Sequence, residues 1–170
     1  MNTKEYVEYL LKNYYELKQD LKFLKYELEM FEGITGEESI DTLNFKKAEG
    51  ETLSMTNVPT DKTGKIALGY NEYMDRMNML GRKEMEFKIQ SLGYELEYLT
   101  HCISRLEPKP RKVMELIYFE KVTWDNISCE CDISIRYVGK IKKQAIDKVC
   151  SFYAKERPGI EMVKIGKVHK

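Results

Sequence analysis

The residues best suited to a chemical task are the basic side chains gathered between residues 134 and 157. This segment holds seven Lys and Arg residues against Asp147 and Glu156, so its net charge is 7 − 2 = +5. Ammonium and guanidinium groups at this density neutralise phosphates, and a guanidinium can also donate two parallel hydrogen bonds to a guanine. The segment therefore predicts contact with double-stranded DNA.

Apolar residues at helical spacing predict how these cations are arranged. They recur every three or four positions and form one stripe of a helix that faces a core, namely Val138, Ile141, Ala145 and Val149. Ser134, a residue type that caps helix N-termini, opens this helix at the DNA-binding surface. The first turns of such a helix meet base edges, while later basic residues meet the backbone. We expect base contacts from Arg136, Tyr137 and Lys140, and phosphate contacts from Thr123, Lys142 and Lys143.

Two shorter helices are predicted just upstream. The first begins at Pro108, because proline suits a helix start. The second begins when Thr123 caps the chain, with Asp125 in the first turn, where the helix dipole favours an acidic group. Asp132 tolerates left-handed backbone geometry, so only about three residues separate this helix from the third, which is the spacing of a helix-turn-helix. We expect the centre of this small domain to consist of Trp124, Ile127, Val138 and Ile141.

A longer run in the same region is characteristic of a known family. It reads Leu106-Glu-Pro-Lys-Pro-Arg-Lys-Val-Met-Glu-Leu-Ile-Tyr-Phe-Glu-Lys-Val-Thr-Trp-Asp-Asn-Ile-Ser. This run resembles region 4 of σ70-type sigma factors, and its continuation to Lys148 resembles the phage regulators of the ArpU and RinA kind, small sigma-like activators of late genes. The sequence departs from the pattern twice, with Asp132 where Gly is frequent and Ser128 where Ala is usual.

The resemblance implies a sequence-specific transcription regulator, a late-gene activator of a phage or prophage, with RNA polymerase as a candidate second partner. A phage small terminase subunit that recognises packaging-site DNA is the alternative, because such a subunit also joins a helix-turn-helix to an oligomerising coiled coil. A helical scaffold whose basic helix is only solvated is a third interpretation.

Two longer helices are predicted from heptad spacing. In the first, the seam positions from Thr3 to Phe31 are Thr3, Val7, Leu10, Tyr14, Leu17, Leu21, Leu24, Leu28 and Phe31. In the second, they are Met85, Ile89, Leu92, Leu96, Leu99, Ile103 and Leu106. We expect these helices to form an antiparallel hairpin and a homo-oligomer, a dimer by preference. The spacing leaves open whether each seam packs within one chain or against a second subunit.

The predicted fold class is therefore all-α, a long coiled-coil helical hairpin followed by a small three-helix domain of the σ70 region 4 kind. The expected segments are an N-terminal coiled-coil helix (1–31), a flexible linker (32–65), a second coiled-coil helix (66–106), the helix-turn-helix domain (107–153) and a basic tail (154–170). Residues 105 to 170 hold 15 basic and 9 acidic residues, a net of +6, and the remainder balances this charge to zero.

Other classes of function find no support in the sequence. The chain has 42% apolar and 33% charged residues and no apolar run of membrane-spanning length, so we expect a soluble, cytoplasmic protein. No phosphate-binding loop, metalloprotease motif or nucleophile elbow occurs, so we expect no enzyme and no cofactor. We expect no metal site from Cys102, Cys129, Cys131 and Cys150, because only His101 and His169 could complete one and the spacings do not fit.

Overall fold

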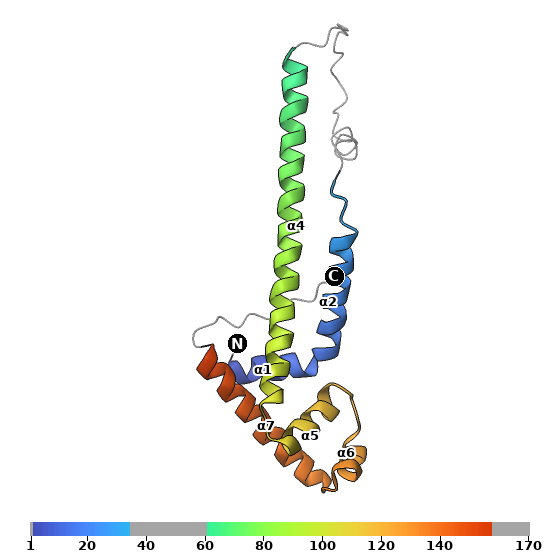
Figure 1. Ribbon diagram of the computed structural model, residues 1–170, viewed down its shortest axis with the longest axis vertical. Coiled ribbons are helices and arrows are strands. Elements are labelled where there is room, and N and C mark those ends of the chain that lie inside the picture. The colour runs from blue at the N-terminus through green and yellow to red at the C-terminus, as the bar shows by residue number, and fades with distance from the viewer. Residues whose placement is uncertain (1, 35–60, 158–170) are drawn as a thin grey trace, which may run out of the picture. The chain divides into compact units, whose positions relative to one another are not determined.

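The computed structural model describes residues 2–34 and 61–157 (Figure 1). These residues form six helices and no strand, so the predicted all-α class is confirmed. The helices are α1 (Thr3–Lys12), α2 (Tyr14–Glu29), α4 (Asp61–Ser104), α5 (Pro108–Tyr118), α6 (Trp124–Cys131) and α7 (Ile135–Glu156). Most of the predicted linker and residues 158–170 of the predicted tail lie outside the described residues. The chain divides into two compact units, residues 1–25 with 89–170, and residues 26–88.

The N-terminal helix predicted to run unbroken to Phe31 is in fact two helices separated at Asn13. The Asn13 backbone leaves helical geometry (φ −99°, ψ 10°), and its side-chain amide donates a hydrogen bond of 2.8 Å to the Tyr9 carbonyl. An asparagine side chain competes in this way with the backbone ladder of a helix. The chain bends between α1 and α2 as a result (Figure 1), and α1 packs against α7.

The first unit is held by one core to which helices distant in sequence contribute. Helix α1 supplies Tyr6, Val7, Leu10 and Leu11, and α2 supplies Leu17 and Leu24. The end of α4 and the loop after it supply Leu92, Leu96, Leu99, Cys102, Ile103 and Leu106, and α7 supplies Ala145, Ile146, Val149 and Tyr153. Leu21 of α2 lies against α4, since a Cβ added at Gly93 would be 3.9 Å from its methyl group. Both predicted seams therefore find apolar partners within one chain.

The second unit has a much smaller core of its own. Met74, which is 8% exposed, is the one buried apolar residue among the described residues of this unit. The Asn78 side chain binds the Ile34 backbone at both ends, accepting from its N–H at 2.9 Å and donating to its carbonyl at 3.0 Å. Gly33 is required beside this contact, because its φ is +82° and an added Cβ would collide with the Asn78 amide.

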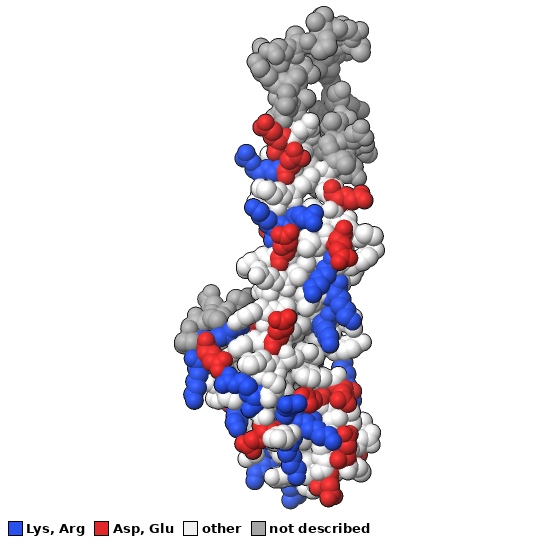
Figure 2. Space-filling view, in the orientation of Figure 1, with Lys and Arg blue, Asp and Glu red and all other residues white. Residues whose placement is uncertain are grey.

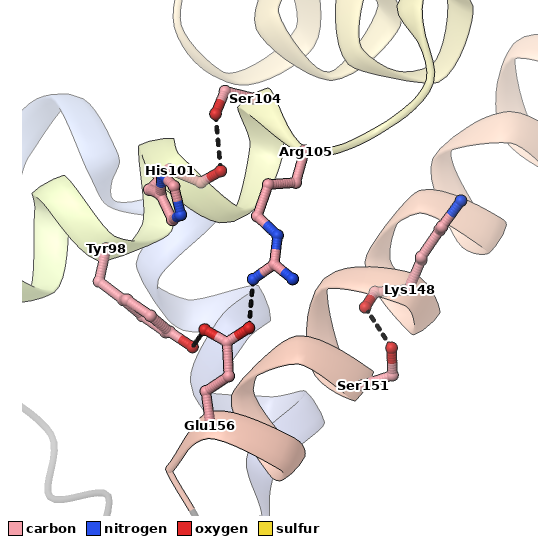
Figure 3. Close-up of polar contacts among 7 residues, drawn as sticks. All are labelled: Tyr98, His101, Ser104, Arg105, Lys148, Ser151 and Glu156. Atoms are coloured by element: carbon pink, nitrogen blue, oxygen red, sulfur yellow. Dashed lines mark hydrogen bonds and ion pairs between the residues drawn. The ribbon is translucent and has the colours of Figure 1, made fainter.

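Polar contacts fasten the end of α7 to α4 in the first unit (Figure 3). Glu156 accepts hydrogen bonds from Arg105 and, at 3.0 Å, from the Tyr98 hydroxyl. Arg157 pairs with Glu95 at 2.5 Å, and only 10% and 12% of these two side chains are exposed. The start predicted for the basic tail, residue 154, is therefore too early. Helix α7 continues to Glu156, and Arg157 is held by its ion pair with Glu95.

Candidate DNA-binding surface

The turn between α6 and α7 has the geometry that a helix-turn-helix needs. Asp132 adopts the predicted left-handed conformation (φ 50°, ψ 55°) where Gly is frequent. The Ser128 hydroxyl donates a hydrogen bond of 2.5 Å to the Ile133 carbonyl, and the Ile133 N–H donates one of 3.0 Å to the Ser128 carbonyl. Both departures from the family pattern thus fit the turn, and the serine adds a bond that alanine could not make.

The two predicted helix caps behave differently. The Ser134 side chain accepts a hydrogen bond of 3.3 Å from the Tyr137 N–H, which confirms the predicted cap of α7. Thr123 has the extended backbone of a capping residue, but its side chain makes no capping hydrogen bond. The predicted side-chain cap of α6 is therefore wrong. The exposed position of Thr123 at the helix start is still the one from which a phosphate contact was predicted.

A second small core positions α6 and α7 on α5. It consists of Val113, Leu116, Ile127, Val138 and Ile141. Three of the four residues predicted at its centre are present, but Trp124 is not, because 40% of this residue is exposed. The indole lies on the outside of α7 instead, where a Cβ added at Gly139 would be 3.5 Å from its ring.

The start of α7 presents a basic surface without compensating acids. Arg136, Tyr137, Lys140 and Lys143 are exposed, while Val138 and Ile141 between them are buried. Among the described residues, no carboxylate forms an ion pair with any of these three cations. Several cations elsewhere are paired, Lys4 with Asp147 at 2.7 Å, Lys112 with Glu130 at 3.0 Å and Lys148 with Glu107 at 3.1 Å. In Figure 2, Lys and Arg side chains are seen along the position that α7 has in Figure 1.

Lys142 occupies a different environment from its neighbour Lys143. Its ammonium group lies 5.4 Å from the ring centre of Trp124 and 5.6 Å from that of Tyr118. An ammonium held against aromatic faces is attracted by their electron-rich surface, so the side chain has a fixed direction. The seven site residues predicted from the sequence all lie on the helix-turn-helix, where Lys142 contacts two aromatic rings and Lys143 is exposed.

Two neighbours of this surface are not among the predicted site residues. The sequence predicts Trp124 in the core, whereas the structure places it in the first turn of α6, at the edge of the surface. Lys4 lines a groove together with Glu8, Gly139, Lys142, Lys143 and Ile146. No local signal points to Lys4, because it reaches the groove only through the packing of α1 on α7.

The described residues contain neither a candidate metal site nor a membrane-spanning helix. No group of three or more His, Cys, Asp or Glu side chains among them is placed to hold a metal ion. Burial raises the pKa of the Cys102 and Cys150 thiols, so both remain protonated at neutral pH. None of the described helices is long and apolar enough to cross a membrane.

Comparison with known proteins gives one family match. Residues 96–148 match the family model described as Sigma-70, region 4. Neither the curated proteins nor the solved structures contain a match to this chain. The matched segment begins at residue 96 inside α4, whereas the predicted domain begins at residue 107. It includes α5, α6 and more than half of α7. The chain therefore carries a helix-turn-helix similar to a DNA-binding domain family, which is not a family of enzymes.

Proposed function

We propose that this protein is a sequence-specific transcription regulator that reads double-stranded DNA with the start of α7. The observation that supports this most directly is the exposed basic surface of Arg136, Lys140 and Lys143, which no carboxylate of the described residues pairs, on a helix-turn-helix similar to Sigma-70, region 4. A cation without an acidic partner is free to replace the counterions of a phosphate or to bind a base edge.

The proposed roles follow from the position of each residue in the helix-turn-helix. Arg136, Tyr137 and Lys140 lie in the first two turns of α7, the part of a recognition helix that meets base edges in the major groove. Arg136 is best suited to a two-bond contact with guanine. We assign phosphate contacts to Thr123, Lys142 and Lys143, and Ser134 supports this surface by capping the helix start.

The first test compares Arg136→Ala with Lys143→Ala. A target site is first obtained by selecting bound fragments from genomic DNA, and each variant is then titrated on that site and on a scrambled duplex at several salt concentrations. Arg136→Ala should lose about 1–3 kcal/mol on the site and little on the scrambled duplex. Lys143→Ala should weaken both alike and reduce the salt slope by about one unit. Equal losses on both duplexes for Arg136→Ala would remove the assignment of base reading.

A narrower proposal is that the protein activates late genes of a phage or prophage, acts in the cytoplasm and contacts RNA polymerase. Its support is the likeness of residues 106–148 to the phage regulators described above, together with the region 4 match. Transcription in vitro from a promoter that carries the selected site, with and without the protein, tests this proposal. Unchanged transcript levels would contradict activation without affecting the evidence for DNA binding.

A small terminase subunit is the second candidate, because the chain joins its helix-turn-helix to long helices. The two candidates differ in assembly. A packaging subunit should form a ring of eight or more copies, whereas a regulator should form a small oligomer. The mass of the free protein in solution therefore separates them.

A further inference from the structure

Helix α4 carries an apolar face in the second unit that no described helix of this unit covers. Its residues are Tyr73 (58% exposed), Met77 (45%), Leu80 (49%) and Phe87 (71%), and we call them the outer seam. The positions 73, 77, 80, 84 and 87 alternate in steps of four and three, with Glu84 as the one polar member. This is the spacing by which a helix packs along another helix.

The outer seam is distinct from the face of α4 that meets the chain segment 26–34. On that inner face Met74 is buried, Asn78 binds the Ile34 backbone, and a Cβ added at Gly81 would be 3.6 Å from the Phe31 ring. Tyr73, Met77 and Leu80 each precede one of these inner residues by a single position, so the two faces are separated by about 100° around the helix. Contact with segment 26–34 therefore leaves the outer seam open.

The exposed area is sufficient for a specific interface. Met30 adds to this exposed area, since 61% of it is exposed. It comes one position before Phe31, which lies against α4 at Gly81. A large apolar or aromatic side chain offers roughly 150–250 Å², so five of them at these exposures offer roughly 500 Å² per chain. Two such faces together reach about 1,000 Å², the lower limit for a stable protein–protein interface.

We propose that a second copy of this chain covers the outer seam. A seam with four-three spacing packs along a helix with the same spacing, and the outer seam of a second copy has it. The seam is also complementary to itself. Leu80 lies seven residues from both Tyr73 and Phe87, so an antiparallel pair related by a two-fold axis places Leu80 on Leu80 and Tyr73 against Phe87.

This surface differs from the N-terminal heptad seam, for which the sequence left open a partner in the same chain or in a second subunit. The heptad residues Leu10, Leu17 and Leu24 are buried in the core of the first unit, so they are not available to a second chain. The proposal is independent of the proposed DNA-binding function, because the outer seam lies in the second unit and its test uses no DNA.

The experiment compares Leu80→Glu with Met79→Glu in the full-length protein. The two residues are adjacent and equally exposed, 49% and 50%, but Met79 lies about 100° from the seam. Mass is measured by sedimentation equilibrium over a wide range of protein concentration. Wild type and Met79→Glu should approach 2 × 20.1 = 40.2 kDa. Leu80→Glu should remain near 20.1 kDa, because its dissociation constant rises by roughly a hundredfold when a carboxylate enters the centre of the interface.

Helix content by circular dichroism shows that a monomeric variant is still folded, and Met77→Glu serves as a second seam variant if Leu80→Glu loses helix. A monomeric wild type would overturn the proposal, as would equal masses for the Leu80 and Met79 variants. A ring of eight or more copies would overturn the two-fold arrangement and would favour the terminase candidate.

Discussion

Single residues of the helix-turn-helix are used in ways that their types alone do not specify. Trp124 is the one tryptophan of the chain, and tryptophan is highly buried on average. Here the ring instead lies over Gly139 and beside Lys142, at the edge of the basic surface. Ile127, three residues further along α6, occupies the core instead and is fully buried.

The exposure of Trp124 predicts a small effect on stability. Trp124→Ala should lower the free energy of unfolding by about 1 kcal/mol, the scale of an exposed contact between a cation and an aromatic ring. Ile127→Ala should lower it by about 2–5 kcal/mol, because it leaves a cavity in a closed core. Urea unfolding monitored by circular dichroism measures both. A larger loss for Trp124→Ala than for Ile127→Ala would restore the tryptophan to the core.

At the scale of elements, a left-handed residue ends α6 and another lies in the loop after α5. Asp132 ends α6 with a φ of 50°, and Lys121 follows α5 with a φ of 54°. Residues with a Cβ are strained in this conformation, and glycine is not. Aspartate is among the residue types that adopt it most readily, so the turn forms without glycine.

This strain predicts that glycine is an improvement at the turn. Asp132→Gly should raise the free energy of unfolding by about 0.5–1 kcal/mol, since glycine is the usual residue at the end of a helix in this conformation. Asp132→Val should lower it by about 1–3 kcal/mol, because a β-branched residue is poorly tolerated there. Thermal melting of the two variants is the measurement. Destabilisation by glycine would show that the aspartate carboxylate itself supports the turn.

At the scale of the whole molecule, the first unit combines α1 and the end of α4 with the helix-turn-helix. Lys4 of α1 pairs with Asp147 of α7, and Arg105, the residue after α4, pairs with Glu156 of α7. The pKa of the Glu156 carboxyl lies below its usual range, first because Arg105 hydrogen-bonds to it and then because the Tyr98 hydroxyl does. Ionisation of this carboxyl therefore favours the folded unit.

The lowered pKa of Glu156 predicts a dependence of stability on pH. Its contribution is present above the ordinary glutamate value of 4.5 and is lost as the pH falls through the lower value of the folded state. Glu156→Gln should therefore lose less stability than wild type between about pH 5 and pH 3. The effect should shrink at high salt, because the pair is exposed. Glu97→Gln, an exposed substitution on α4, controls for the loss of one carboxylate. Identical pH profiles for wild type and Glu156→Gln would contradict the assignment.

The sequence by itself determined those features that depend on local pattern. Pro108 begins α5, Asp132 is left-handed, Ser134 caps α7, and the stripe from Val138 to Val149 is buried, all as predicted. Each of these depends on backbone preference or on the repeat of a helix, and both are encoded within a few residues. The apolar positions of both predicted seams also identified half of the buried core residues of the first unit.

The tertiary structure alone decided which surfaces those patterns meet. A heptad repeat predicts that a helix packs against another helix, but it does not identify that helix. Here the seams of α2 and α4 pack within one chain. The break at Asn13 changes little in the spacing of apolar residues, yet it directs α1 to α7 and places Lys4 beside Lys142. The burial of Arg157 against Glu95 joins residues 62 positions apart. Such contacts follow from the packing of the whole unit, because many distant side chains fix them together and no short stretch of sequence encodes them.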